Sequence, residues 1–60
     1  MVNVEIRKLI FEHGLKYYDV ADRIGIGDST FSVWLRKELE GERRERTLHA
    51  INELVAEKEK

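Results

Sequence analysis

The sequence predicts an all-α domain, and three observations support this. The 60 residues include no proline, apolar residues recur every three or four positions between the four glycines, and no stretch alternates apolar and polar residues as a half-buried strand does. A chain of this length buries only about 60% of the surface that its unfolded form exposes. We therefore expect one compact four-helix domain, held by packing alone because there is no cysteine.

The first helix is predicted over residues 4–13. Asn3 precedes it as an N-cap, and Gly14 follows it as a residue that can adopt a positive φ. The pair Gly14 and Leu15 is typical of a Schellman ending, in which Leu15 folds back toward Ile10.

This first helix has two apolar faces. The larger face is made of Ile6, Leu9, Ile10 and His13. Val4 and Phe11 lie together on nearly the opposite face. Two faces imply two neighbours, so Val4 and Phe11 are candidates for a contact with another protein.

The second and third helices are predicted over residues 17–24 and 28–38. Gly25 ends the second helix, and Asp28 opens the third with a carboxylate that the positive end of the helix dipole favours. Phe31 centres the inward face of the third helix, with Trp34 and Leu35 beside it and Leu39 as a possible extension. The outward positions are Ser29, Ser32, Val33, Arg36 and Lys37.

A fourth helix is predicted over residues 42–57. Its apolar stripe consists of Leu48, Ile51, Leu54 and Val55, with Thr47 at the edge. Residues 58–60 are expected to fray.

The second and third helices together predict a helix-turn-helix. Ala21 allows the two helices to cross closely, and Gly25 suits the start of a tight turn. The segment "LKYYDVADRIGIGDSTFSVWL" resembles the Cro/repressor-type (XRE-like) helix-turn-helix DNA-binding family, whose small members regulate phages and mobile elements. The residues that carry the resemblance are Val20, Ala21, Ile24, Gly25, Ile26, Ser29, Thr30, Phe31 and Trp34.

The resemblance implies a lambda repressor-like fold and a cytoplasmic transcriptional regulator that binds double-stranded DNA, with the third helix in the major groove. The implied base-edge contacts are Asp28, Ser29, Ser32 and Val33. The implied phosphate contacts are Lys16, Tyr17, Arg36, Lys37, Arg43 and Arg44. Many family members carry an Arg–Glu ion pair that also places a phosphate contact, where this sequence has Ile10 and Leu35.

Charge leaves other interpretations open. The net charge is −1, which argues mildly against nucleic acid, although residues 1–37 hold six Lys and Arg against five Asp and Glu, and residues 38–60 hold five against seven. The alternatives are a protein-interaction module, such as an anti-repressor or adaptor that keeps the fold, and a regulatory antitoxin. A homodimer or a complex with another regulator is possible in each case.

Several classes of function are not expected from these residues. His13 and His49 are too few for a structural zinc site, and we find neither a nucleophile paired with a base nor a glycine-rich phosphate loop. No apolar run is long enough to span a bilayer. The sequence therefore predicts no enzyme, no cofactor, no metal, no small-molecule substrate and no membrane contact.

Overall fold

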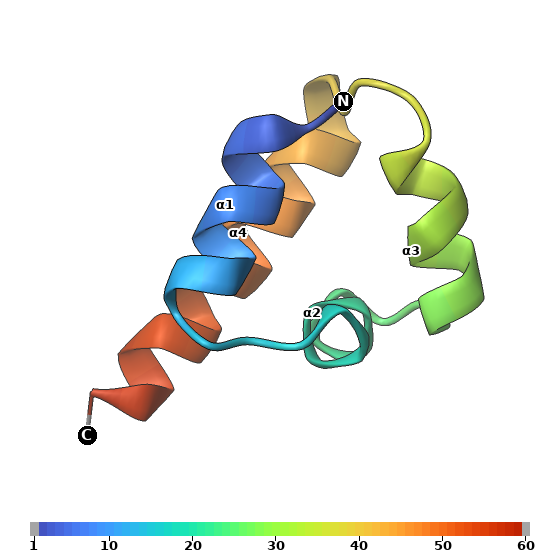
Figure 1. Ribbon diagram of the computed structural model, residues 1–60. Coiled ribbons are helices and arrows are strands. Elements are labelled where there is room, and N and C mark those ends of the chain that lie inside the picture. Colours follow the sequence, from blue (N-terminus) through green and yellow to red (C-terminus); the bar gives the residue numbers. More distant parts are fainter. Residues whose placement is uncertain (1, 60) are drawn as a thin grey trace.

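The computed structural model describes residues 2–59, and within that range the chain forms four helices and no strand. They are α1 (Val4–Glu12), α2 (Tyr17–Ile24), α3 (Asp28–Leu35) and α4 (Gly41–Lys58). In Figure 1, α1 and α4 lie side by side, α2 is seen almost end-on, and α3 stands on the far side of α2. The predicted all-α four-helix domain is confirmed.

α2 lies at the centre of the packing. It contacts both α3 and α4, while α1 packs against α4. Ala21 of α2 and Ala50 of α4 are both buried, and small side chains of this kind let helices approach closely. The buried apolar residues are Ile6, Ile10, Val20, Ala21, Phe31, Leu35, Leu39, Ala50 and Ile51.

α1 ends in the predicted Schellman motif. The amide of Leu15 donates to the carbonyl of Ile10 at 2.9 Å, and the amide of Gly14 donates to that of Phe11 at 3.1 Å. Gly14 has φ +66°, the left-handed conformation that glycine adopts without strain.

The turn between α2 and α3 is built in the same way. Gly25 has φ +98°, and its amide donates to the carbonyl of Asp22 at 3.1 Å. The amide of Ile26 donates to the carbonyl of Ala21 at 3.0 Å. These bonds close α2 and turn the chain into α3 within three residues, so α2 and α3 form a helix-turn-helix.

Asn3 occupies the predicted N-cap position of α1, but its side chain does not cap the helix. Asn3 is 3% exposed and takes the left-handed conformation, with φ 59°, and its side chain makes no capping bond to α1. Its Nδ2 instead donates to the carbonyls of Leu35 (3.0 Å) and Lys37 (2.8 Å), and its Oδ1 accepts from the amide of Leu39 (2.8 Å). The side chain therefore joins the start of the chain to the segment that links α3 and α4.

α3 ends at Leu35, not at residue 38 as predicted. The carbonyl of Leu35 accepts hydrogen bonds from Asn3 and from Arg7 Nη2, at 3.0 and 3.2 Å, so side chains replace the next helical donors. Leu39 is buried, as the sequence suggested, but it reaches the core from an extended segment after the helix has ended.

The buried face of α4 is rotated relative to the predicted stripe. Thr47, Ala50 and Ile51 are buried, whereas Leu48, Leu54 and Val55 are half-buried. Thr47 is tolerated there because its Oγ1 donates to the carbonyl of Arg43, one turn earlier, at 2.8 Å.

The last predicted feature, a frayed tail over residues 58–60, is wrong for Lys58. Lys58 belongs to α4, and its Nζ donates to the carbonyl of His13 at 2.7 Å. This bond satisfies a carbonyl at the end of α1, which closes at Glu12, one residue before the predicted end. Residue 60 lies outside the described residues.

The bonds of Asn3 generate a prediction about stability. Asn3→Ala leaves two carbonyls and one amide without their hydrogen-bond partner. It also places alanine in the left-handed region, where the Cβ atom strains the backbone. We therefore expect the free energy of unfolding to fall by about 3 kcal/mol. Urea denaturation followed by circular dichroism measures this change. Asn52→Ala, on the exposed side of α4, is the matched control and should change stability by no more than about 0.5 kcal/mol. Equal effects of the two substitutions would contradict the role given to Asn3.

Candidate nucleic-acid interface

The outward face of α3 carries the four predicted base-edge residues. All four, Asp28, Ser29, Ser32 and Val33, are exposed. On the opposite side of the helix, Phe31 and Leu35 are buried at 0% and 3% exposure. The helix is thus fixed by one side and presents short side chains on the other.

Three of the predicted phosphate contacts flank this face. Arg36 and Lys37 are exposed directly after α3, and Lys16 is exposed directly before α2. Tyr17 opens α2, and its ring meets the ring of Phe31 edge to face, with centroids 6.4 Å apart.

Arg43 and Arg44 are engaged elsewhere. The guanidinium of Arg43 lies 4.9 Å from the centre of the Trp34 ring, and that of Arg46 lies 5.9 Å from it. Trp34, predicted to face inward, is only half-buried and is covered by these two cations. Arg44 pairs with Glu5 at 3.2 Å.

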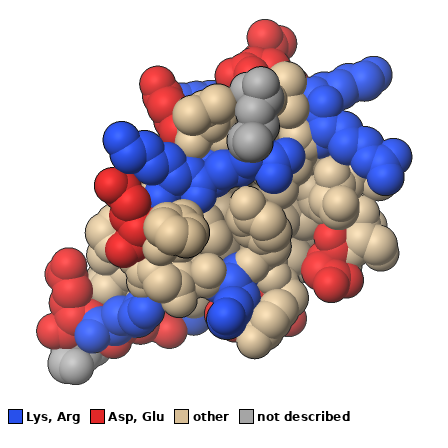
Figure 2. Space-filling view, viewed as in Figure 1, with Lys and Arg blue, Asp and Glu red and all other residues tan. Residues whose placement is uncertain are grey.

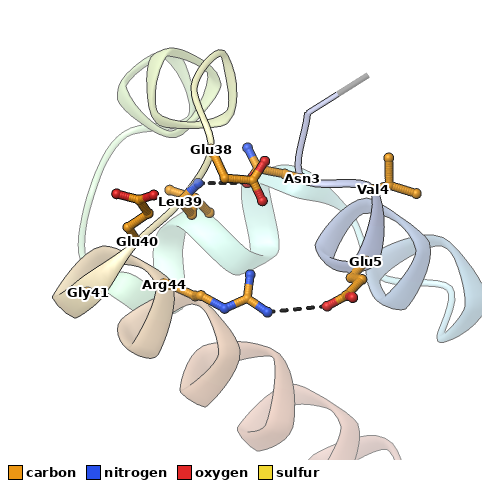
Figure 3. A pocket seen from close by; sticks show the side chains of 8 residues that line it. All are labelled: Asn3, Val4, Glu5, Glu38, Leu39, Glu40, Gly41 and Arg44. Atoms are coloured by element: carbon orange, nitrogen blue, oxygen red, sulfur yellow. Dashed lines mark hydrogen bonds and ion pairs between the residues drawn. The ribbon is translucent and has the colours of Figure 1, made fainter.

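Arg44 belongs to an acidic corner where the start of α1 meets the start of α4. Figure 3 shows its guanidinium directed toward Glu5, with Glu38 and Glu40 on the segment that leads into α4. Three carboxylates and one guanidinium leave this corner with a local charge of −2. The corner therefore repels phosphates, and Arg44 is poorly placed to contact them.

A cationic pocket opens between α1, α2 and α3, and it contains a residue that the sequence analysis missed. Its polar lining is Arg7, Tyr17, Asp28, Ser32 and Arg36, and its apolar lining is Phe31 and Leu35. Arg7 follows the buried Ile6 and precedes the buried Ile10 by one helical turn, so it lies at the edge of the buried face. The position of Arg7 beside this buried face was the sequence signal that could have predicted a half-buried cation.

The charged groups are distributed unevenly over the surface. On the side shown in Figure 2, the region over α3 at the right is largely free of charge, with Lys and Arg at its upper end and an acidic patch below. Carboxylates gather toward the margins of the view. The outward side of α3 is therefore less acidic than the net charge of the chain suggests.

The second apolar face of α1 has no cover among the described residues. Val4 is 55% exposed and Phe11 84% exposed. A shallow apolar groove beside Phe11 is lined by Ile10, Leu15 and Tyr17, with Lys16 at its rim. Of the two neighbours expected for α1, the described residues supply one, the core that covers the larger face.

Two further contacts hold α2 against α4. Arg23 forms an ion pair with Glu57, and Arg46 Nη2 donates to the carbonyl of Ile24 at 3.2 Å. The hydrogen bond to Glu57 raises the pKa of Arg23 above its usual value. Because arginine is already protonated at any physiological pH, this contact fixes the helices without adding a pH switch.

The chain was compared with known protein families, curated proteins and solved structures, and no match was found in any of the three. Among residues 2–59, no helix has the length and apolar character needed to cross a membrane. Over the same range, no three His, Asp or Glu side chains are grouped so that they could hold a metal ion.

Proposed function

We propose that this protein binds double-stranded DNA as a transcriptional regulator, with α3 as the recognition helix. The observation that carries the proposal is the outward face of α3, an exposed helical surface of short polar side chains held at both ends by hydrogen bonds. A major groove about 12 Å wide admits such a helix without large side chains holding it away.

The anchoring of α3 supports this function. Its start follows the turn at Gly25, and its end is bonded by Asn3 and Arg7, so the orientation of the helix is fixed before any ligand binds. A binding surface whose supporting residues are already ordered loses less conformational entropy on association.

The side chains of α3 match the chemistry of base edges. Ser29 and Ser32 can donate or accept a hydrogen bond, so they suit several bases, and the exposed methyl groups of Val33 suit contact with the methyl group of thymine. Asp28 can accept from the amino group of cytosine, and it also stabilises the start of α3 through the helix dipole. Sequence preference on such a face is modest, because none of these residues makes a bidentate contact to guanine.

The flanking cations supply the electrostatic part of binding. Lys16, Arg36 and Lys37 are exposed around α3 and lie within reach of the phosphates on either side of a groove. Each phosphate neutralised adds about −0.9 to the slope of log affinity against log salt concentration. Three such contacts correspond to a slope of about −2.7.

The resemblance to Cro/repressor-type regulators adds support, because the helix-turn-helix is formed by the segment that carries it. On this basis the protein is a small regulator of phage or mobile-element type that acts in the cytoplasm. The function requires neither catalysis nor a cofactor.

A second function, a protein-interaction module, is favoured by one observation. Phe11 is 84% exposed beside an apolar groove, and a large exposed aromatic side chain is typical of interface anchors. Another regulator or a second copy of this chain would then cover Phe11 and Val4.

The DNA-binding function makes a prediction about Ser29. Ser29→Glu places a carboxylate against the phosphates and bases while leaving a good helix-opening residue, so we expect duplex affinity to fall at least about tenfold with no loss of helicity. Fluorescence anisotropy against duplexes selected from a random pool measures affinity, and circular dichroism measures folding. Asn52→Glu, which adds the same charge on α4, is the control and should change affinity much less. A salt-independent affinity, or equal losses for both variants, would exclude the proposal.

The two candidate functions differ at Phe11. Because this side chain is exposed, Phe11→Gln should leave stability within about 0.5 kcal/mol of the original protein. If α3 binds DNA, we expect duplex affinity to remain within about twofold of the original value. Sedimentation velocity of the protein alone tests the protein-interaction function. That function would be favoured if the original protein self-associates without binding duplex DNA and Phe11→Gln loses the self-association.

A further inference from the structure

The cationic pocket between α1, α2 and α3 has the chemistry of a phosphate site. Arg7 comes from α1, Tyr17 from α2, Ser32 from α3, and Arg36 from the position directly after α3. Three helices thus bring two guanidinium groups and two hydroxyl groups to one place. We propose that this pocket holds one phosphate of the DNA backbone and that Arg7 is its principal cationic ligand, an inference that rests on the proposed function.

The hydrogen bonds of Arg7 leave donors available. Its Nε donates to the carbonyl of Val2 at 3.0 Å and its Nη2 to the carbonyl of Leu35 at 3.2 Å. A guanidinium carries five N–H groups, so these two bonds leave three for a ligand. The two carbonyls also fix the plane of the group, which lowers the entropy lost when an anion binds.

The charge of Arg7 is not neutralised within the protein. Arg7 is half-buried, and neither it nor Arg36 takes part in an ion pair among residues 2–59. The carboxylate in the pocket, Asp28, opens α3 and leaves the pocket with a local charge of +1 from two cations and one anion. A partly desolvated cation without an acidic partner favours an anionic ligand.

The rest of the pocket suits a phosphate oxygen. The hydroxyl groups of Ser32 and Tyr17 can donate to it, and guanidinium groups match phosphate geometry with paired N–H donors. Phe31 and Leu35 form an apolar floor that excludes water from one side of the site. Ser32 belongs to both the pocket and the outward face of α3, so a phosphate bound here lies beside the bases that α3 contacts.

Arg7 also links the phosphate to the orientation of α3. Its Nη2 is bonded to the last carbonyl of the helix, and the Arg7 side chain lines the pocket. A phosphate held by Arg7 is therefore fixed relative to the end of the recognition helix, which sets the register of α3 in the groove.

The test compares salt dependence in Arg7→Gln and Lys8→Gln. Both variants lose one positive charge from α1, but Lys8 is exposed and lies outside the pocket. We expect the slope of log duplex affinity against log salt concentration to become shallower by about 0.9 in Arg7→Gln and to stay unchanged in Lys8→Gln. Arg7→Lys, which keeps the charge, should retain most of the slope.

The slope separates binding from a purely structural role. If Arg7→Gln is partly unfolded and the folded fraction is the same at every salt concentration, the apparent affinity falls by one constant factor. The slope of log affinity against log salt concentration then stays unchanged. Thermal melts over the same salt range verify that condition. An unchanged slope in Arg7→Gln, with salt-dependent binding by the original protein, overturns the phosphate assignment and leaves the DNA-binding function standing. Absence of duplex binding by the original protein overturns both.

A free phosphate ion has the same chemistry as a phosphate of the DNA backbone and is the other ligand to be tested. Inorganic phosphate, titrated into ¹⁵N-labelled protein, reports on the pocket through the Nε–H resonance of Arg7. A shift of this resonance with duplex, together with the shallower slope, supports the backbone assignment. Saturation by inorganic phosphate with an unchanged duplex slope would assign the pocket to a free phosphate and contradict the proposal.

Discussion

The position of α3 depends on the side chain of Asn3. Three hydrogen bonds from this one amide group hold the segment after α3 against the start of α1, at 2.8 to 3.0 Å. The amide serves as both donor and acceptor, so it completes the backbone bonding of a buried segment that has no helix or sheet to supply it. Because the bonds end α3 at Leu35 and direct Leu39 into the core, they fix the length of α3 and the path into α4.

α2 is the other fixed point of the domain. Its small side chains allow close packing on α4, and the three-residue turn that follows leaves α3 little freedom in direction. α3 is thus held at its start by the turn, along its length by Phe31 and at its end by Asn3. A helix of eight residues needs such support, since isolated helices shorter than about 12 residues are marginal in water.

The sequence predicted those features that local interactions determine. The Schellman ending at Gly14 and the end of α2 at Gly25 follow from glycine and its neighbours alone, and the inward and outward faces of α3 follow from helical spacing. Features that depend on contacts distant in sequence could not be predicted in the same way. Asn3 precedes a helix, so local chemistry suggests an N-cap, and only the approach of Leu35, 32 positions away, supplies the alternative partner.

The distinction between local and distant contacts also explains the other differences between the sequence prediction and the structure. Thr47 is buried on α4, and which face of α4 is buried depends on the other helices that pack against it. The proposed role of Arg7 depends on Ser32 of α3 and on Arg36 directly after that helix, which no spacing within α1 reveals. Family resemblance pointed instead to position 10, where the apolar Ile10 packs in the core.

The low net charge is compatible with a DNA-binding surface because screening makes charge a local property. At physiological ionic strength the Debye length is about 8 Å, whereas the principal extents of the domain are 33, 22 and 19 Å. The carboxylates of the acidic corner lie at the junction of α1 and α4, and one of them, Glu5, is paired with Arg44. A phosphate beside α3 interacts mainly with the cations around Ser32. If α3 binds DNA as proposed, a net charge of −1 limits the affinity, and the distribution of charge affects the orientation in which the duplex approaches.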